Sequence, residues 1–259
     1  MASRILLGLV ALRVTLVYAA TLTIVAATLL ALGPRAQTSV VARMSTNVDN
    51  LARGHLDTLV GSAFVTDGGQ IYLWLPGLVC LLAVAELLWR SARVVLALAL
   101  GHIGATLIVA GGLAIALEMR WLPVGTARAS DVGISYATAG VLGALTAAIP
   151  PGWRAAWTGW WVASVVLVAT VSQDFTSVGH ALALMLGILL SGRLGLPARW
   201  TPTRWGLLVA GSWFGYLTLA GAAVPTAPIV GLAGAATARV AHVVAGRWRQ
   251  QTFTGEPAQ

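Results

Sequence analysis

Two apolar segments of this chain each carry one side chain that could take part in nucleophilic chemistry. Ser135 lies near the start of an apolar stretch at 133–150, and His180 lies near the start of another at 176–192. A serine beside a neutral histidine can lose its hydroxyl proton and act as a nucleophile. Polar groups inside a membrane are costly and usually have a partner or a task. The serine could instead hydrogen-bond only to its own helix and the histidine only to a neighbouring one, so the chemistry depends on whether Ser135 and His180 meet.

The composition is that of an integral membrane protein. Of 259 residues, 58% are hydrophobic and only 9% are charged, whereas a soluble domain carries about 25% charged residues. The net charge of +8 comes from 16 basic residues, all of them arginine. These arginines lie between the apolar segments, where they set orientation, and they leave no basic face for nucleic acid. The lipid bilayer is therefore an expected partner, and nucleic acid is not.

The cysteine and histidine content predicts no metal site and no cofactor. The four histidines, His55, His102, His180 and His242, are widely scattered. No group of cysteines and histidines has the spacing of metal ligands. The single cysteine, Cys80, lies in an apolar run, as is typical of a small core residue.

The apolar pattern predicts an all-α protein with several membrane-spanning helices. A spanning helix needs about 20 apolar residues, and the candidate segments are 12–32, 71–89, 94–117, 133–150, 155–172, 176–192 and 205–223. The first apolar stretch is too long for a signal peptide, so it predicts an uncleaved helix. A weaker eighth segment at 226–246 contains Pro228 and Arg239, which favour either a short span or a surface helix.

One long polar loop, at 33–70, interrupts this pattern. It is the only sizeable hydrophilic segment between the predicted helices. Within it, the mixed sequence at 58–64 predicts an interfacial helix lying on the membrane. A polar loop of this length in a compact protein is either functional or a spacer between helices.

The arginines favour a cytoplasmic N-terminus. With that orientation, the inner side carries eight arginines, at positions 4, 13, 90, 93, 154, 193, 199 and 204. The outer loops carry five, at positions 35, 43, 53, 120 and 128. Because arginine is enriched in cytoplasmic loops, we expect a multi-pass protein of the cell membrane with its N-terminus inside.

Helix alternation makes His180 the histidine best placed to meet Ser135. The segments at 133–150 and 176–192 run in the same direction, and at about 1.5 Å per residue both side chains lie within roughly 10 Å of the same rim. His102 lies in a helix that runs the opposite way, and His55 and His242 lie in a loop and the tail. First-turn N–H groups beside Ser135 lack intrahelical partners and could stabilise an oxyanion, with Gly133 allowing close backbone approach.

Small residues recur at helical spacing in several of the segments. Ala183 and Gly187 are four residues apart, as are Gly211 and Gly215, and Gly140 precedes Gly143 by three. Such pairs let helix backbones approach closely in lipid. They predict a tightly packed bundle and no chemistry of their own.

The serine and histidine helices resemble those of the rhomboid family of intramembrane serine proteases. The family's serine helix looks like Gly-X-Ser-Gly, with a glycine eight residues after the serine, and Gly133, Ser135 and Gly143 fall on that frame. Its histidine helix has small residues before the histidine and three and seven residues after it. Gly179, Ala183 and Gly187 stand in these places around His180.

Other parts of the chain resemble the same family in the same order. Ser62-Ala-Phe64 is similar to the segment before the family's second helix, Glu86 and Trp89-Arg90-Ser-Ala-Arg93 to its acidic-then-basic turn, and Gly101 and Gly104 to its third helix. The resemblance covers roughly residues 12–192. It implies a rhomboid-like six-helix core at 1–192, with the outer loop at 33–70. Residues 193–259 would add one or two C-terminal helices and a tail.

The chain departs from the family's pattern around the serine. The family's second helix usually carries a histidine and, four residues later, an asparagine that help to bind the oxyanion. The matching stretch at 70–76 has neither, which leaves Gln70 or Tyr72 as substitutes. Tyr136 replaces the glycine after the serine, and Ala139 stands where an aromatic residue usually packs against the histidine. Loss of one oxyanion donor can cost about 10²–10³ in rate.

Two functional hypotheses follow, from different classes. The resemblance implies an intramembrane serine endopeptidase that cleaves a transmembrane substrate, with Ser135 as nucleophile and His180 as base. The departures favour instead a catalytically inactive rhomboid-like protein that binds transmembrane clients. A transporter is a third class, but the helices carry little interior charge and show no inverted repeat.

Overall fold

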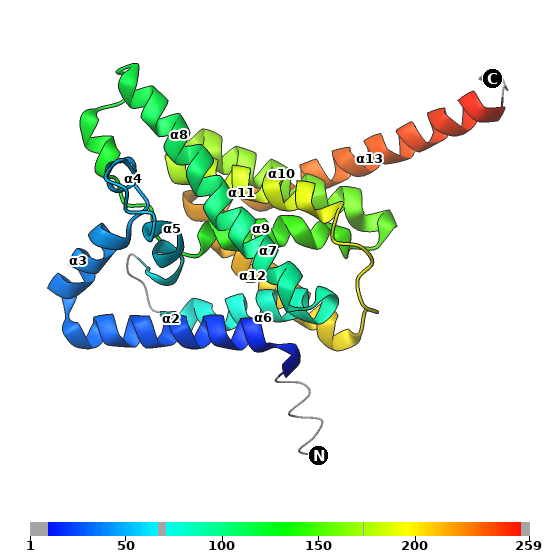
Figure 1. The fold of residues 1–259 in the computed structure, drawn as a ribbon. Helices are drawn as coiled ribbons and strands as arrows, with labels where there is room; N and C mark the ends of the chain where they lie inside the picture. Colours follow the sequence, from blue (N-terminus) through cyan, green and yellow to red (C-terminus); the bar gives the residue numbers. More distant parts are fainter. Residues whose placement is uncertain (1–9, 67–70, 173, 255–259) are drawn as a thin grey trace, which may run out of the picture.

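The structure is a computed structural model, and it describes residues 10–66, 71–172 and 174–254. Within these ranges every regular element is a helix (Figure 1). The longer ones are α2 (Arg13–Leu32), α6 (Ile71–Trp89), α7 (Ser91–Ala99), α8 (Ala105–Glu118), α9 (Ser135–Ala144), α10 (Pro151–Ser172), α11 (Phe175–Ser191), α12 (Pro202–Ala220) and α13 (Ala227–Thr254). The all-α architecture predicted from the apolar pattern is confirmed.

Five of the described helical stretches are long and apolar enough to cross a membrane. They are Arg13–Leu32, Ile71–Trp89, Ser91–Glu118, Pro151–Ser172 and Ala227–Trp248. The third joins α7 and α8 through a π-helical turn at Leu100–Gly104. The weak eighth segment of the sequence is thus one continuous helix of 28 residues, of which Ala227–Trp248 has the length and apolarity of a span.

Helix α9 is shorter than the predicted span at 133–150. It has ten residues, followed by a 3₁₀ turn at Leu145–Ala147. Ten residues rise about 15 Å, half of the hydrocarbon thickness. Every residue from Tyr136 to Ala144 is buried, so α9 is enclosed by other helices. Its apolar sequence therefore reflects burial in protein on all sides.

Glycines bring the neighbours of α9 into backbone contact with it. A Cβ added to Gly101, in the π-helical turn, would lie 2.8 Å from the Cα of Gly140. On the other side, a Cβ on Gly187 of α11 would lie 2.1 Å from the carbonyl oxygen of Gly140, and one on Gly143 would lie 2.2 Å from that of Leu184. The tight packing predicted from the small residues is confirmed at these positions.

A buried carboxylate joins the first two long helices. Glu86, which is 2% exposed in α6, accepts hydrogen bonds from the backbone N–H groups of Val14 and Thr15 at 3.0 and 2.9 Å. The hydroxyls of Thr15 and Ser91 also donate to it. Glu86 therefore caps the first turn of α2 from another helix, which satisfies N–H groups that a helix start leaves unpaired.

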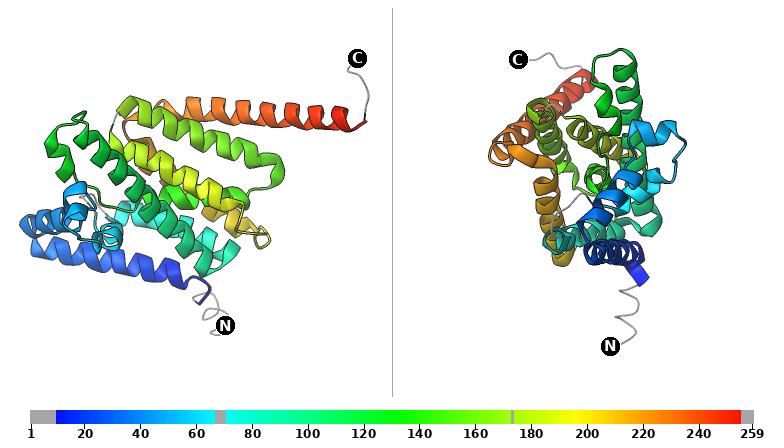
Figure 2. Two further views of the ribbon diagram at one scale, coloured as in Figure 1. Left: turned by 45° about the horizontal axis from the view of Figure 1, so that its top comes forward. Right: turned by 90° about the vertical axis from the view of Figure 1, so that its left-hand side faces the viewer.

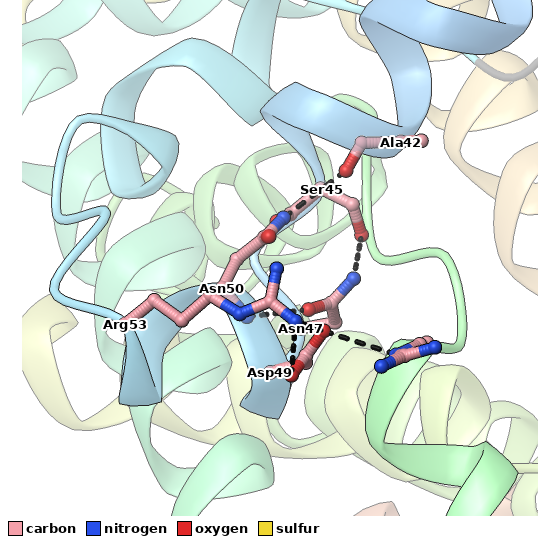
Figure 3. A network of polar contacts seen from close by, with 7 residues as sticks. Ala42, Ser45, Asn47, Asp49, Asn50 and Arg53 are labelled. Carbon is pink, nitrogen blue, oxygen red and sulfur yellow. Dashed lines mark hydrogen bonds and ion pairs between the residues drawn. The ribbon is translucent and has the colours of Figure 1, made fainter.

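The long polar loop at 33–70 is folded in its described part, residues 33–66. It contains α3 (Pro34–Met44), α4 (Val48–Ala52), α5 (Thr58–Gly61) and a 3₁₀ turn at Ser62–Phe64. Figure 3 shows the polar network around α4, in which the Asn50 amide donates to the carbonyl groups of Ala42 and Ser45, and Asp49 pairs with Arg53. Arg128 also pairs with Asp49, from the turn that precedes α9.

Part of the segment at 58–64 is packed inside the protein, while Val60 is 58% exposed. Thr58 and Ser62 are fully buried, and Ala63 is 9% exposed. The hydroxyl of Thr46 donates to the carbonyl group of Thr58 at 2.8 Å, and the N–H of Gly133 donates to that of Ser62 at 2.8 Å. The mixed polar pattern thus comes from side chains that are satisfied inside the protein.

The C-terminal helices pack against different helices of the bundle. Helix α12 lies against α6 and α9, where Gly211 meets the backbone of Leu81 and Gly215 meets the side chain of Leu142. Helix α13 lies along α10, with Gly234 against Gly159, and then extends past the other helices (Figures 1 and 2). Helix α12 is therefore an integral part of the helix bundle.

Candidate functional site

Ser135 is the first residue of α9 and lines a cavity of about 710 Å³. Its helix begins after Ile134, whose apolar side chain makes no capping hydrogen bond. The first-turn N–H groups of α9 are thus left without the side-chain acceptor that a serine or aspartate cap would supply. The cavity is bounded by Ser135 and the residues before it, by α6 and by α12. The half-buried hydroxyl of Ser135 and the uncapped N–H groups of α9 therefore lie together at the edge of an apolar cavity.

His180 lies on the helix packed most closely against that of Ser135. Contacts run in the same direction along both helices, from Tyr136 beside Gly179 and His180 to Gly143 beside Gly187. The helices are therefore parallel, and Ser135 and His180 lie at corresponding levels. No hydrogen bond joins the two side chains in the described structure, where both ring nitrogens of His180 are buried without a hydrogen-bond partner.

Tyr136 provides an aromatic contact to His180. Its ring meets the imidazole edge-on, with 5.4 Å between centroids and 82° between planes. A Cβ on Gly179 would lie 2.2 Å from the Tyr136 ring, so only glycine leaves room for it. The rhomboid resemblance implies an aromatic residue at the position of Ala139, but the ring that contacts His180 comes from the residue directly after the serine. The Tyr136 hydroxyl is buried near the carboxyl group of Asp131.

The other residues predicted to support the oxyanion are arranged differently. Gly133 lines the cavity and has a φ of +114°, which glycine adopts readily. Its N–H is used by the carbonyl group of Ser62, so it is not free to bind an oxyanion. Tyr72 is 65% exposed and does not line the cavity. Gln70 lies outside the described residues.

The structure contains a second serine–histidine pair, which the sequence did not predict. Ser62 Oγ and His102 Nε2 are 3.0 Å apart and share a hydrogen bond, and Thr46 Oγ1 lies 2.8 Å from the same serine oxygen. Ser62 is fully buried and His102 is 6% exposed. The opposite course of its helix predicts that His102 lies in the other half of the membrane from Ser135, but the polar loop at 33–70 folds inward to reach it. The pair anchors the loop to the π-helical turn.

Asp131 links this loop to the start of α9. Its N–H donates to Ser45 Oγ at 2.8 Å, and its carbonyl group accepts from the N–H of Thr46 at 3.0 Å. Burial raises the pKa of its carboxyl group to about 6. The folded chain therefore binds this proton more tightly than the unfolded chain, and the associated stabilisation is lost as pH rises from about 4 to 6.

We expect Asp131→Asn to remove this pH dependence. The variant should unfold at a higher temperature than the wild type at pH 7 and at a similar temperature at pH 4, because the asparagine has no charge to bury. Thermal unfolding in detergent across this range is the measurement, with the exposed Asp57→Asn as the matched control. If the unfolding temperatures of Asp131→Asn and the wild type change in the same way with pH, the raised pKa of Asp131 is contradicted.

Comparison with known proteins agrees with this architecture. The family model described as rhomboid-like protein matches residues 11–192, which run from the start of α2 to the end of α11. No curated protein and no solved structure matches the chain. The matched part contains Ser135, His180, the polar loop at 33–70 and the Glu86 cap, and it ends before α12. With its apolar helices and a match over more than half of its length, the chain is a multi-pass membrane protein that belongs to the rhomboid-like family.

Proposed function

We propose that this protein is an intramembrane serine endopeptidase that acts on a transmembrane polypeptide. The observation that carries the proposal is the position of Ser135, on the wall of an apolar cavity and at the uncapped start of α9. His180 supports it, because a histidine with two unpartnered nitrogens lies at the corresponding level of the parallel helix. We also infer from the arginine distribution that the protein resides in the cell membrane with its N-terminus inside.

The proposed reaction proceeds by acyl transfer. Ser135 Oγ attacks the peptide carbonyl carbon while His180 takes the hydroxyl proton. The negative charge on the carbonyl oxygen is stabilised by first-turn N–H groups of α9. His180 then protonates the leaving amine as the carbon–nitrogen bond breaks, and a water molecule hydrolyses the acyl-enzyme. The hydrogen bond between Ser135 and His180 forms when substrate is bound, since catalytic hydrogen bonds often tighten only in that complex.

A second candidate function is client binding without cleavage. It is favoured by the missing hydrogen bond between Ser135 and His180 and by the exposed position of Tyr72. In this case the cavity holds part of a transmembrane client, and Ser135 donates a hydrogen bond to it. The two candidates differ in whether Ser135 is nucleophilic.

Labelling with a fluorophosphonate probe separates the two candidates. Purified protein should be labelled covalently, Ser135→Ala should abolish the label, and His180→Ala should slow it by about 10²–10⁴ through loss of the base. Ser62→Ala is the matched control, because Ser62 has a histidine partner but does not line the cavity. Labelling that survives in Ser135→Ala, or is absent from a correctly folded wild type, contradicts the protease and leaves the client-binding function.

A further inference from the structure

We propose that helix α12, which lies beyond the residues matched by the family model, completes the Ser135 site and that Phe214 sets the size of the group admitted to it. This inference rests on the proposed function for the identity of the occupant, an apolar segment of a membrane-embedded polypeptide. The inference that α12 forms a wall of the cavity does not depend on that function, because it is drawn from the packing of α6 and α12. Five residues of α12 line the cavity: Ala210, Trp213, Phe214, Leu217 and Thr218.

Close backbone packing holds α12 in this position. A Cβ on Gly211 would lie 2.7 Å from the Cα of Leu81 in α6, and one on Gly215 would lie 2.4 Å from a methyl group of Leu142 in α9. These glycines are four residues apart and present one face of α12 to the bundle. The adjoining wall of the cavity is α6, which carries Pro76 inside the helix at the level of the cavity.

Phe214 is the side chain that joins the two walls. It is 6% exposed and stacks on Trp74 of α6, with 6.4 Å between ring centroids. A Cβ on Gly77 would lie 2.4 Å from the Cβ of Phe214, so α6 leaves room at that position for the phenylalanine. Removing the ring would enlarge the space beside Ser135, while removing a buried side chain elsewhere on α12 would not.

The chemistry of the cavity indicates what it admits. Its lining is mostly apolar, and hydrogen-bond donors gather at the Ser135 end, where the hydroxyl and the uncapped start of α9 lie. An apolar side chain with an adjacent backbone carbonyl matches both features. In this arrangement the carbonyl lies at Ser135 and the side chain packs against Trp74 and Phe214.

Cys80 allows the wall to be tested without any catalytic step. It lines the same cavity and is the only cysteine in the sequence. In a Ser135→Ala background, a compact and a bulky methanethiosulfonate reagent are compared for their rates of reaction with Cys80. We expect Phe214→Ala to raise the rate with the bulky reagent about tenfold relative to the compact one. Leu208→Ala is the control, because Leu208 is 4% exposed on the same helix but does not line the cavity.

The possible results separate the proposal about the cavity wall from the proposal that the protein is a protease. Equal rate ratios in folded Phe214→Ala and wild type overturn the inference. The expected change at Cys80, combined with no fluorophosphonate labelling of Ser135, supports the wall and contradicts the protease. If Cys80 reacts in detergent but is protected in nanodiscs made of phospholipid alone, the cavity holds a lipid chain, and the polypeptide occupant is overturned. With active protein, Phe214→Ala should likewise shift labelling of Ser135 toward bulky fluorophosphonates.

Discussion

Replacing Gly187 with leucine should prevent the protein from folding to its native state. The Cβ alone would lie 2.1 Å from the carbonyl oxygen of Gly140 and 2.9 Å from the nitrogen of Ala144. Overpacking a core with flexible side chains costs about 1–3 kcal/mol, but here the obstacle is the backbone of α9. Helix α9 cannot move away, because Gly101 packs against Gly140 from the other side so closely that a Cβ on Gly101 would lie 2.8 Å from the Gly140 Cα. We therefore expect a loss of more than about 3 kcal/mol.

The measurement is the yield of monodisperse protein in detergent together with its unfolding temperature. Gly111→Leu is the matched control, because Gly111 lies in α8 with nothing within 4 Å of an added Cβ. That change should be neutral or slightly stabilising, since leucine has a higher helix propensity than glycine. A folded Gly187→Leu protein with an unchanged unfolding temperature would show that α9 and α11 do not pack as described.

Replacing Glu86 with alanine should have the next largest effect. Its carboxylate accepts from two backbone N–H groups and two hydroxyls in a buried site, and its removal leaves all four donors without their acceptor. Each unsatisfied buried donor costs about 1–3 kcal/mol. Rearrangement will recover part of this, so we expect a loss of about 3–5 kcal/mol, comparable to removing one partner of a buried ion pair.

Substitutions of Glu86 that remove one or both acceptor oxygens test whether loss of the cap causes the loss of stability. Glu86→Gln keeps one acceptor oxygen and should lose less than Glu86→Ala. Glu118→Gln is the control, because Glu118 ends α8 in an exposed position and should unfold like the wild type. Limited proteolysis near residue 12 should increase in Glu86→Ala before global unfolding, because α2 loses its cap. Equal stability of Glu86→Ala and wild type would contradict this role.

Much of the helical framework follows from the sequence because its physical cause is local. Stretches of apolar residues at 12–32, 71–89 and 155–172 correspond closely to α2, α6 and α10. In lipid, backbone polar groups must be paired within the segment, so a long apolar run has few alternatives to a helix. The glycine spacing likewise predicts close packing, and alternation of the spans predicts the parallel course of α9 and α11.

The arrangement of polar groups depends on contacts between distant residues and was predicted less well. Hydropathy gives no measure of how far a polar loop folds inward, so the pair of Ser62 and His102 was missed. The resemblance implies an aromatic neighbour for His180 four residues after Ser135, but Tyr136 reaches His180 because Gly179 leaves the space. The apolar run at 133–150 predicts a full membrane span, whereas α9 has only ten residues and is too short to cross the bilayer alone.

The sequence by itself determined that this is an all-helical membrane protein with a serine and a histidine on two parallel helices, because apolar runs and helix direction depend on neighbouring residues. Only the tertiary structure decided that Ser135 opens into a cavity, that His180 packs against Tyr136 with its nitrogens unpartnered, and that α12 forms one wall. Cavities and side-chain partners arise where helices distant in sequence meet. Their geometry depends on how closely glycines allow those helices to approach.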